Sequence, residues 1–171
     1  METVRRQITL FVPGPERSRL DSIREQFNPA QAALIAAHVT LCRDDEVLEW
    51  SALQDRAQQM SDFVVSLRFG APVREHNLVY LPVVESTESF DELRQQVLDD
   101  EACRIQEPHV TLIHPRNGTC TDATFKAIQS LLNEELNITF RELTFIEKIG
   151  EHPWRSVQTF PTLEPAGHPE R

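Results

Sequence analysis

The tetrapeptide His-Val-Thr-Leu occurs twice, as His38-Val39-Thr40-Leu41 and as His109-Val110-Thr111-Leu112, 71 positions apart. Two similar segments lie upstream, Phe11-Val12-Pro13 and Tyr80-Leu81-Pro82, 69 positions apart. The gap from proline to histidine is 25 residues in one copy and 27 in the other, and a helical pattern fills both gaps. This internal repeat predicts two lobes of like design, related by a pseudo-twofold axis, whose repeated strands face each other across a cleft.

Strand-like and helix-like segments alternate outward from the repeat. Apolar or alternating runs predict strands over 5–12, 37–42, 63–69, 78–84, 109–113, 138–149 and 155–160. Helical spacing of apolar residues predicts four helices, marked by Leu20, Ile23 and Phe27; by Trp50, Leu53, Ala57 and Met60; by Phe90, Leu93 and Val97; and by Phe125, Ile128, Leu132 and Leu136, with Thr121 or Asp122 as the N-cap of the last. The expected fold is α+β, a bilobal duplicated fold with two mainly antiparallel sheets around a central cleft and helices on the outside.

The length of 171 residues fits one domain made of two lobes. We expect this domain to span residues 1–163, with the lobe boundary near 70–76, where Gly70-Ala71-Pro72 interrupts a strand. The last strand can cross back to the first lobe. Residues 164–171 have no periodicity, and we expect a frayed tail there.

Charge and composition limit the possible partners. The chain has 17 Lys and Arg against 27 Asp and Glu, a formal charge of -10, which opposes general affinity for DNA or an RNA backbone, so any phosphate site must be local. No apolar stretch approaches the roughly 20 residues that cross a bilayer, so we expect no membrane partner. Three cysteines without a C-x-x-C pair argue against a disulfide framework and favour the cytoplasm. We expect a monomer, although no sequence feature determines the oligomeric state.

The repeated motif places polar groups on one side of each strand. Side chains alternate faces, so His38 and Thr40 share one face, and His109 and Thr111 share the corresponding face of their strand. Across a cleft, these four residues form a set of two imidazoles and two hydroxyls. Histidine titrates near pH 6.5, so one imidazole can act as a base and the other as an acid. A single His-x-Thr is usually a cross-strand polar pair or a satisfied histidine, but its repetition favours catalysis.

These features resemble the two-histidine (2H) phosphoesterase superfamily, which includes 2′-5′ RNA ligase-like proteins and RNA 2′,3′-cyclic phosphodiesterases. The resemblance rests on the two H-x-[ST]-x motifs and covers about Arg5 to Thr162. It implies metal-free, cofactor-free hydrolysis of a 2′,3′-cyclic phosphate to a 2′-phosphate, on an RNA end or a small cyclic nucleotide. The catalytic residues would be His38, Thr40, His109 and Thr111. A 2′-5′ RNA ligase, or a non-catalytic module that binds RNA ends or nucleotides, remains the alternative.

Three further residues are candidates for substrate binding. Phe11 and Tyr80 occupy equivalent repeat positions and can flank the site and stack on a base or ribose, although core packing explains them equally well. Arg43 follows the first motif, as Arg116 follows the second, and either could reverse the local field; a solvated surface arginine is the simpler interpretation of each.

Metal and thiol chemistry are not expected. His109 and His114 are five residues apart on a strand, so regular alternation points them to opposite faces, and no carboxylate lies at a ligand spacing. Cys42 shares the face of His38 if its strand stays regular. Without an orienting partner, however, it is better interpreted as a small residue that fills space at the strand end than as a nucleophile.

Overall fold

The computed structural model describes residues 1–162 and confirms the α+β fold with antiparallel sheets. The strands are β1 (Val4–Phe11), β2 (His38–Arg43), β3 (Val65–Phe69), β4 (Val73–Glu75), β5 (Leu78–Pro82), β6 (His109–Ile113), β7 (Leu136–Phe140), β8 (Glu142–Ile149) and β9 (Arg155–Pro161). The helices are α1 (Gly14–Phe27), α2 (Pro29–Ala32), α3 (Trp50–Gln59), α4 (Glu88–Leu98) and α5 (Asp122–Leu131), with a 3-10 turn, η1 (Asp44–Glu46). The tail expected at 164–171 lies outside the described residues.

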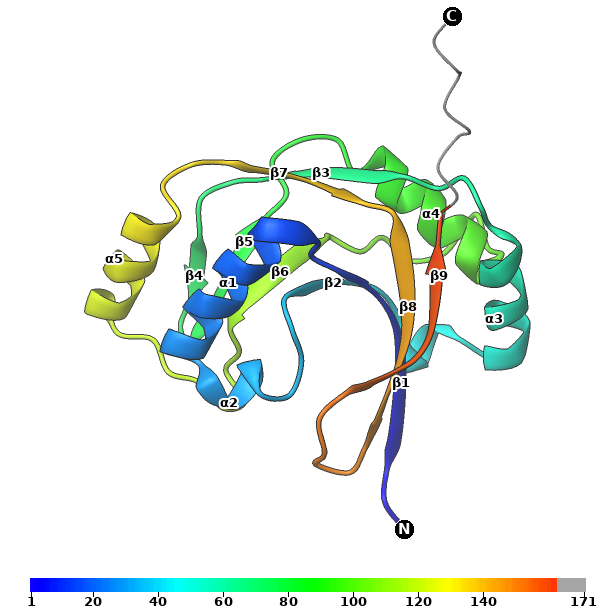
Figure 1. The fold of residues 1–171 in the computed structure, drawn as a ribbon, viewed down its shortest axis with the longest axis horizontal. Helices are drawn as coiled ribbons and strands as arrows, with labels where there is room; N and C mark the ends of the chain where they lie inside the picture. Colours follow the sequence, from blue (N-terminus) through cyan, green and yellow to red (C-terminus); the bar gives the residue numbers. More distant parts are fainter. Residues whose placement is uncertain (163–171) are drawn as a thin grey trace, which may run out of the picture.

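The first lobe is built on a four-stranded sheet of order β2-β1-β8-β9. β1 lies at its centre and pairs antiparallel with β2 on one side and β8 on the other, as Figure 1 shows. Late segments of the chain therefore complete the sheet that the first strand begins. The side chain of Trp50 on α3 stacks on Phe145 of β8, with ring centroids 5.3 Å apart, and so attaches that helix to the sheet.

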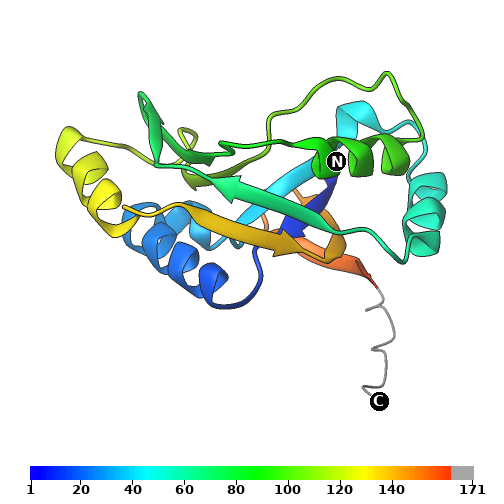
Figure 2. The ribbon, with the colours of Figure 1, turned by 90° about the horizontal axis from the view of Figure 1, so that it is seen from above.

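The second lobe contains two smaller sheets where one was expected, a three-stranded sheet β4-β5-β6 and a two-stranded sheet β3-β7. A bridge between Phe69 and Val83 joins them, and the amide of Gly70 donates to the carbonyl of Pro82. A Cβ at Gly70 would collide with a methyl carbon of Val84, so only glycine allows this approach. Figure 2 shows β3 and β7 side by side, with α1 and α5 at one end of the molecule and α3 and α4 at the other.

The predicted strand 138–149 is two strands that serve different lobes. β7 pairs with β3 in the second lobe, and β8 pairs with β1 in the first, so the chain changes sheet at Arg141. Leu136, expected on the preceding helix, begins β7 instead, because α5 ends at Leu131. A continuous apolar pattern does not reveal where a strand leaves one sheet for another.

Both motif strands contain a β-bulge at the same place. In the first lobe Thr9 pairs with Thr40 and Ile8 with Cys42, which leaves Leu41 as the extra residue. In the second lobe the extra residue is Leu112, next to the buried Ile113. A bulge reverses the alternation beyond it. Residues after each bulge therefore face the opposite way from a regular strand.

The strand register also corrects the alignment of the repeat. Phe11 pairs with His38, but Pro82 pairs with His109; Thr9 pairs with Thr40, but Tyr80 pairs with Thr111. The offset between the lobes is therefore 71 residues for both strands. Phe11 and Tyr80, aligned at an offset of 69, are not equivalent positions, because the two similar tripeptides are in different registers.

The described part of the chain has no helix long and apolar enough to cross a bilayer.

Candidate active site

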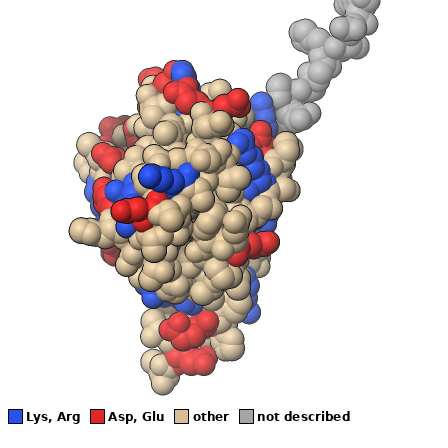
Figure 3. All heavy atoms as spheres, turned by 90° about the vertical axis from the view of Figure 1, so that its left-hand side faces the viewer, with Lys and Arg blue, Asp and Glu red and all other residues tan. Residues whose placement is uncertain are grey.

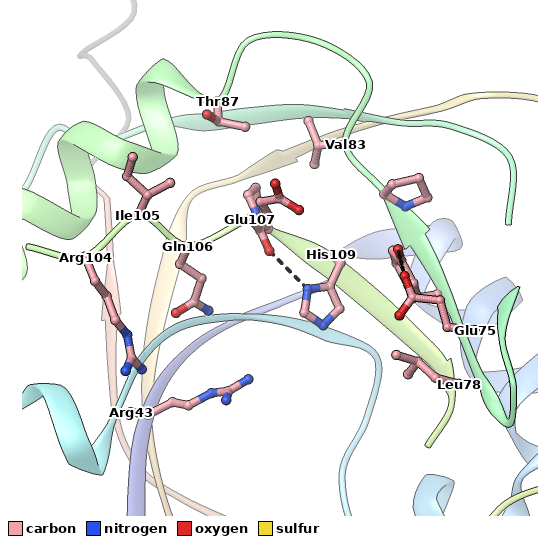
Figure 4. A pocket seen from close by; sticks show the side chains of 13 residues that line it. Arg43, Glu75, Leu78, Val83, Thr87, Arg104, Ile105, Gln106, Glu107 and His109 are labelled. Atoms are coloured by element: carbon pink, nitrogen blue, oxygen red, sulfur yellow. Dashed lines mark hydrogen bonds between the residues drawn. The ribbon is translucent and has the colours of Figure 1, made fainter. Parts of the chain in front are cut away.

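The two motif histidines are held by the same backbone device. Nδ1 of His38 lies 2.8 Å from the carbonyl oxygen of Ala36, and Nδ1 of His109 lies 3.0 Å from that of Glu107, two residues earlier in each case. The second contact is the dashed line in Figure 4. A carbonyl oxygen only accepts, so each Nδ1 carries the proton. Nε2 of each ring is thus left to exchange a proton with a substrate or water.

The structure brings the two histidines into one neighbourhood. β2 contacts β6, although the strands belong to different sheets. The pKa of His38 is lowered to about 4, chiefly by burial and also by the nearby positive charges of Arg24 and His109, which together outweigh the backbone hydrogen bond to Ala36 and the charge of Asp21 that raise it. His38 is consequently a neutral imidazole at neutral pH, in the state a base requires.

The two motif threonines differ in their partners. The hydroxyl oxygen of Thr40 accepts a hydrogen bond of 3.2 Å from the amide of Gln7, which also donates to Thr9. The Thr40 hydroxyl keeps its own hydrogen for donation. Among residues 1–162, the hydroxyl of Thr111 has no hydrogen-bond partner. Both hydroxyls are therefore available as donors to an anionic oxygen.

Two buried arginines cross between the lobes. Arg24 of α1 donates from Nε to the carbonyl oxygen of Thr111 at 3.1 Å and from Nη1 to that of Ile35 at 2.8 Å. Arg94 of α4 donates to the carbonyl oxygen of Leu41, the last residue of the first motif. Arg24 is 2% exposed and Arg94 1%. Arg24 thus fixes α1 to the second motif strand, and Arg94 fixes α4 to the first.

Arg94 also anchors the segment that precedes His109. Its guanidinium pairs with the buried carboxylate of Glu46 at 2.5 Å and donates to the carbonyl oxygen of Arg104 at 3.0 Å. From the same segment, the side-chain amide of Gln106 donates to the carbonyl oxygen of Thr40 at 2.9 Å. These contacts connect the segment that precedes His109 to the first motif strand.

A pocket of about 820 Å³ opens beside His109. Figure 4 shows Arg43 reaching from β2 toward the region below the imidazole of His109. Of the predicted site residues, His109, Tyr80 and Arg43 line this pocket, and His38, Thr40, Thr111 and Phe11 lie outside its wall. The remaining lining residues are Glu75, Leu78, Pro82, Val83, Thr87, Arg104, Ile105, Gln106, Glu107 and Pro108.

The two aromatic candidates each contact the histidine of their own lobe. The ring of Tyr80 meets that of His109 edge-on at 5.6 Å, and the ring of Phe11 meets that of His38 edge-on at 6.2 Å. Arg17 lies over the Phe11 ring at 5.3 Å. The ring of Tyr80 therefore lines the pocket, whereas the ring of Phe11 packs against the half-buried His38 outside it.

The bulges change the interpretation of two residues. Cys42 was assigned to the face of His38 only for a regular strand; the bulge turns it into the core, where it is fully buried and burial raises its pKa to about 12. It is thus a core thiol and no nucleophile. His114 was expected opposite to His109, but the bulge lies between them, and the charges of Arg43 and Arg5 reach His114. Within residues 1–162 no cluster of His, Cys, Asp or Glu could hold a metal ion.

The crossing arginines are the residues that the sequence analysis missed, although a signal for them exists. Arg24 lies next to Ile23, four positions after Leu20, on the apolar face of its helix. Arg94 has the same relation to Leu93 and Phe90. A charged residue at an apolar position, repeated in both helices, indicates a buried role.

The duplicated fold brings two strands with the same motif into contact, as in the superfamily of 2H phosphoesterases and 2'-5' RNA ligases. The 2'-5' RNA ligase superfamily matches residues 11–152, and the chain belongs to this superfamily.

Solved structures agree in fold. LigT from E. coli, complexed with NADP+, is 14% identical with a TM-score of 0.59, and the match covers 96% of this chain and 100% of LigT. The apo form of E. coli LigT is 15% identical with a TM-score of 0.60, and the match covers 95% of this chain and 99% of LigT. The protein TT0787 of Thermus thermophilus is 13% identical with a TM-score of 0.54, and the match covers 92% of this chain and 97% of TT0787. A comparison with curated proteins finds no match.

Proposed function

We propose that the protein is a metal-independent phosphodiesterase that opens a 2′,3′-cyclic phosphate to a 2′-phosphate. The observation that carries this proposal is the pair of identically held histidines on two strands in contact, each with Nε2 left for proton transfer. An acid and a base that act on one phosphate are each worth about 10²–10⁴-fold in rate. The membership of the superfamily supports an enzyme of this kind.

The lowered pKa of His38 supports a division of roles. His38 is neutral and takes a proton from water as the water oxygen forms its bond to phosphorus. The bond between phosphorus and the ribose 3′ oxygen breaks, and His109 gives its proton to that oxygen. The product carries the phosphate on the 2′ oxygen. Proton exchange with solvent then restores a neutral His38 and a protonated His109.

The threonines and Arg43 stabilise charge on the phosphate. The hydroxyls of Thr40 and Thr111 donate to the nonbridging oxygens as negative charge builds in the transition state. Arg43 reaches toward the region below His109, so its guanidinium adds positive charge beside the leaving oxygen. The hydrogen bond from Gln7 orients Thr40 so that its hydrogen is free for this donation.

The pocket beside His109 suits the nucleoside. Tyr80 offers a ring against which a base or ribose packs, and Leu78 and Ile105 add apolar surface. Crystals of LigT hold NADP+, ATP and 3'-AMP, all of them nucleotides, which supports a nucleotide in the related cleft of this chain.

The test is hydrolysis of adenosine 2′,3′-cyclic phosphate in the presence of EDTA, with the product identified by ³¹P NMR. We expect turnover to the 2′-phosphate, and loss of turnover in His38→Ala and His109→Ala. Formation of a 2′-5′ linkage from two RNA ends, with no hydrolysis, would assign the ligase activity. Tight binding of the cyclic nucleotide without turnover would assign a binding module.

A further inference from the structure

A group of positively charged side chains from both lobes gathers beside the motif strands. Arg116 contacts His114, with Nη2 3.3 Å from the ring Nε2. Partial burial lowers the pKa of His114, and the charges of Arg116, Arg43 and Arg5 lower it further. The three arginines come from three different segments, β1, the end of β2 and the turn after β6. The fold therefore concentrates like charges at one place.

These three arginines lack the partners that most other basic groups have. Nine basic side chains among residues 1–162 form ion pairs. Within the same residues, Arg5, Arg43 and Arg116 form none. Arg5 also stands directly opposite Lys148 of β8, whose ammonium pairs with the exposed Glu151 at 3.7 Å. Like charges in opposed positions of a sheet are unfavourable unless an anion offsets them.

The strand geometry places this group on the cleft side. Arg5, Gln7 and Thr9 alternate on one face of β1, and Thr9 pairs with Thr40 there. Arg43 pairs with Gln7, because the bulge at Leu41 reverses the alternation and returns Arg43 to that face. Arg5 and Arg43 thus share the face of the sheet that carries Thr40, and the charges of both reach His114, which Arg116 contacts.

An aromatic ring supports one of the arginines. The guanidinium of Arg5 lies 5.6 Å from the ring centroid of Trp154. The amide of Trp154 donates to the carbonyl oxygen of Leu34 at 2.9 Å, which holds the turn between β8 and β9 against the segment leading to β2. Arg5 is therefore kept in position without neutralising its charge.

We infer that Arg5 and Arg116, with His114, form a second phosphate subsite, next to Arg43 at the reacting centre, that binds a phosphate on the 5′ oxygen of the substrate nucleoside. The inference rests on the proposed function, since it assumes that the reacting cyclic phosphate lies between the two motifs. The 5′ phosphate has two sources. It is a free 5′-monophosphate in a small nucleotide, or the internucleotide phosphodiester in an RNA end.

The subsite takes one phosphate and does not begin a longer track. Figure 3 shows the end of the molecule that carries α1 and α5, where basic and acidic side chains are interspersed. The formal charge of the chain, -10, opposes binding of further phosphates. The benefit of added phosphates should therefore stop after the first.

The experiment compares four substrates that end in a 2′,3′-cyclic phosphate: adenosine, 5′-phosphoadenosine, the dinucleotide ApA and the trinucleotide ApApA. We expect kcat/KM to rise about tenfold when a 5′ phosphate is present, the scale of one charge-assisted contact. The slope of log kcat/KM against log salt should steepen by about 0.7, the value for one phosphate on a single strand. The trinucleotide should gain nothing over the dinucleotide. A gain for 5′-phosphoadenosine alone identifies the monoester as the source, and a gain for ApA identifies the diester.

Arg5→Gln and Arg116→Gln should each remove most of this gain and leave kcat/KM on the one-phosphate substrate within about twofold, because an exposed arginine outside the reacting centre contributes little to it. Arg141→Gln is the matched control, since it removes one exposed arginine from the junction of β7 and β8 and changes the net charge equally. It should keep the full gain. Thermal unfolding of all three variants checks that they fold.

The outcomes separate the two proposals. If the one-phosphate substrate is hydrolysed and a 5′ phosphate adds nothing, or if Arg5→Gln and Arg116→Gln keep the gain, the subsite is refuted and the phosphodiesterase stands. If no substrate is hydrolysed, the phosphodiesterase is refuted. Calorimetry with adenosine 3′,5′-bisphosphate and 3′-AMP then decides the subsite. Tighter binding of the bisphosphate that disappears in Arg116→Gln supports it, and equal binding of the two nucleotides overturns it.

Discussion

The two lobes place the same motif on the same bulged strand but surround it differently. In the first lobe, Thr9 stands opposite the motif threonine, and the neighbouring Gln7 forms a hydrogen bond to that threonine. In the second lobe, Tyr80 stands opposite the motif threonine and its ring lies against His109 in an open pocket. The two lobes share the backbone of the repeat, whereas the side chains around the two histidines differ.

This difference explains how one motif can supply two roles. Both rings offer Nε2, because both Nδ1 atoms face a backbone carbonyl. Only the environment distinguishes them, and burial lowers the pKa of His38. Titratable groups of one kind whose environments differ are the usual source of an acid and a base in one site. The comparison therefore supports the proposed base in the first lobe and the proposed acid in the second.

The most severe way to break the pair is to remove either imidazole. We expect His38→Ala and His109→Ala each to lower kcat on adenosine 2′,3′-cyclic phosphate by about 10²–10⁴-fold, since each loses one proton-transfer group. The double variant should be little worse than the weaker single variant, because the two groups act as a unit. Circular dichroism checks that each variant folds. A rate near that of the wild type in either single variant would refute the assignment of that histidine.

Replacing the two crossing arginines, Arg24 and Arg94, should lower the free energy of unfolding by different amounts. Arg94→Met takes the strongest partner from Glu46, a side chain only 5% exposed, and should cost about 3 kcal/mol in the free energy of unfolding. Arg24→Met should cost about 1–2 kcal/mol, because its partner Asp21 is 24% exposed and still accepts from the amide of Ala37. Urea denaturation measures both. Equal losses in the free energy of unfolding would contradict the expectation that Arg94 stabilises the fold more than Arg24 does.

A matched variant separates the ion pair from the packing. Arg94→Met with Glu46→Gln removes both charges and should recover part of the loss, since the buried carboxylate is then absent. No recovery would assign the effect to the hydrogen bonds that Arg94 donates to the carbonyl oxygens of Leu41 and Arg104.

Much of the fold could be predicted because its period is visible in the chain. The repeat of His-Val-Thr-Leu and the helical spacing of residues such as Leu20 and Ile23 are local patterns, and the predicted α+β, two-lobed fold follows from them. The exchange of strands at Arg141 could not be predicted, because β7 and β8 have one uninterrupted apolar pattern. Pairing partners are set by contacts between distant segments.

The site was less predictable for the same reason. The bulges at Leu41 and Leu112 follow from the pairing of β1 with β2 and of β5 with β6, and they decide that Cys42 is buried and that Arg43 faces the cleft. Sequence alternation assumes a regular strand. The proposed division of roles between His38 and His109 rests on the burial that lowers the pKa of His38, which identical tetrapeptides cannot encode.

The pH dependence of kcat/KM tests whether His38, with its lowered pKa, is the base. This ratio reports the free enzyme, whose base must be neutral. The pKa of His38 is lowered to about 4, so the neutral fraction falls only as the pH drops through about 4. We expect the acidic limb of the profile near pH 4, with no loss on that limb between pH 6.5 and 5. An acidic limb centred between pH 6 and 7 would contradict the assignment of His38 as the base.

The same shift has a consequence for stability with a definite sign. In the unfolded chain His38 titrates near 6.5, and in the folded chain near 4. Between these values the unfolded state binds the proton more readily, so the free energy of unfolding should fall as the pH falls from about 6.5 to about 4. His38→Gln should flatten this part of the curve, measured by urea denaturation across the range. An unchanged curve would mean that the pKa of His38 is not lowered in the folded protein.

The smallest effect we predict separates the two aromatic rings. Tyr80 lines the pocket beside His109, so Tyr80→Ala should raise KM for a cyclic mononucleotide about tenfold with little change in kcat, on the scale of one base-stacking contact. Phe11 lies against His38 and outside the wall of the pocket. Phe11→Ala should leave KM within about twofold, since it removes no surface that meets the nucleoside, and should instead raise the pKa of His38 by admitting water beside it. Steady-state kinetics and an NMR titration of the His38 ring give the two readouts. Equal increases in KM would show that both rings meet the substrate, and that the two sides of the cleft are more alike than their registers indicate.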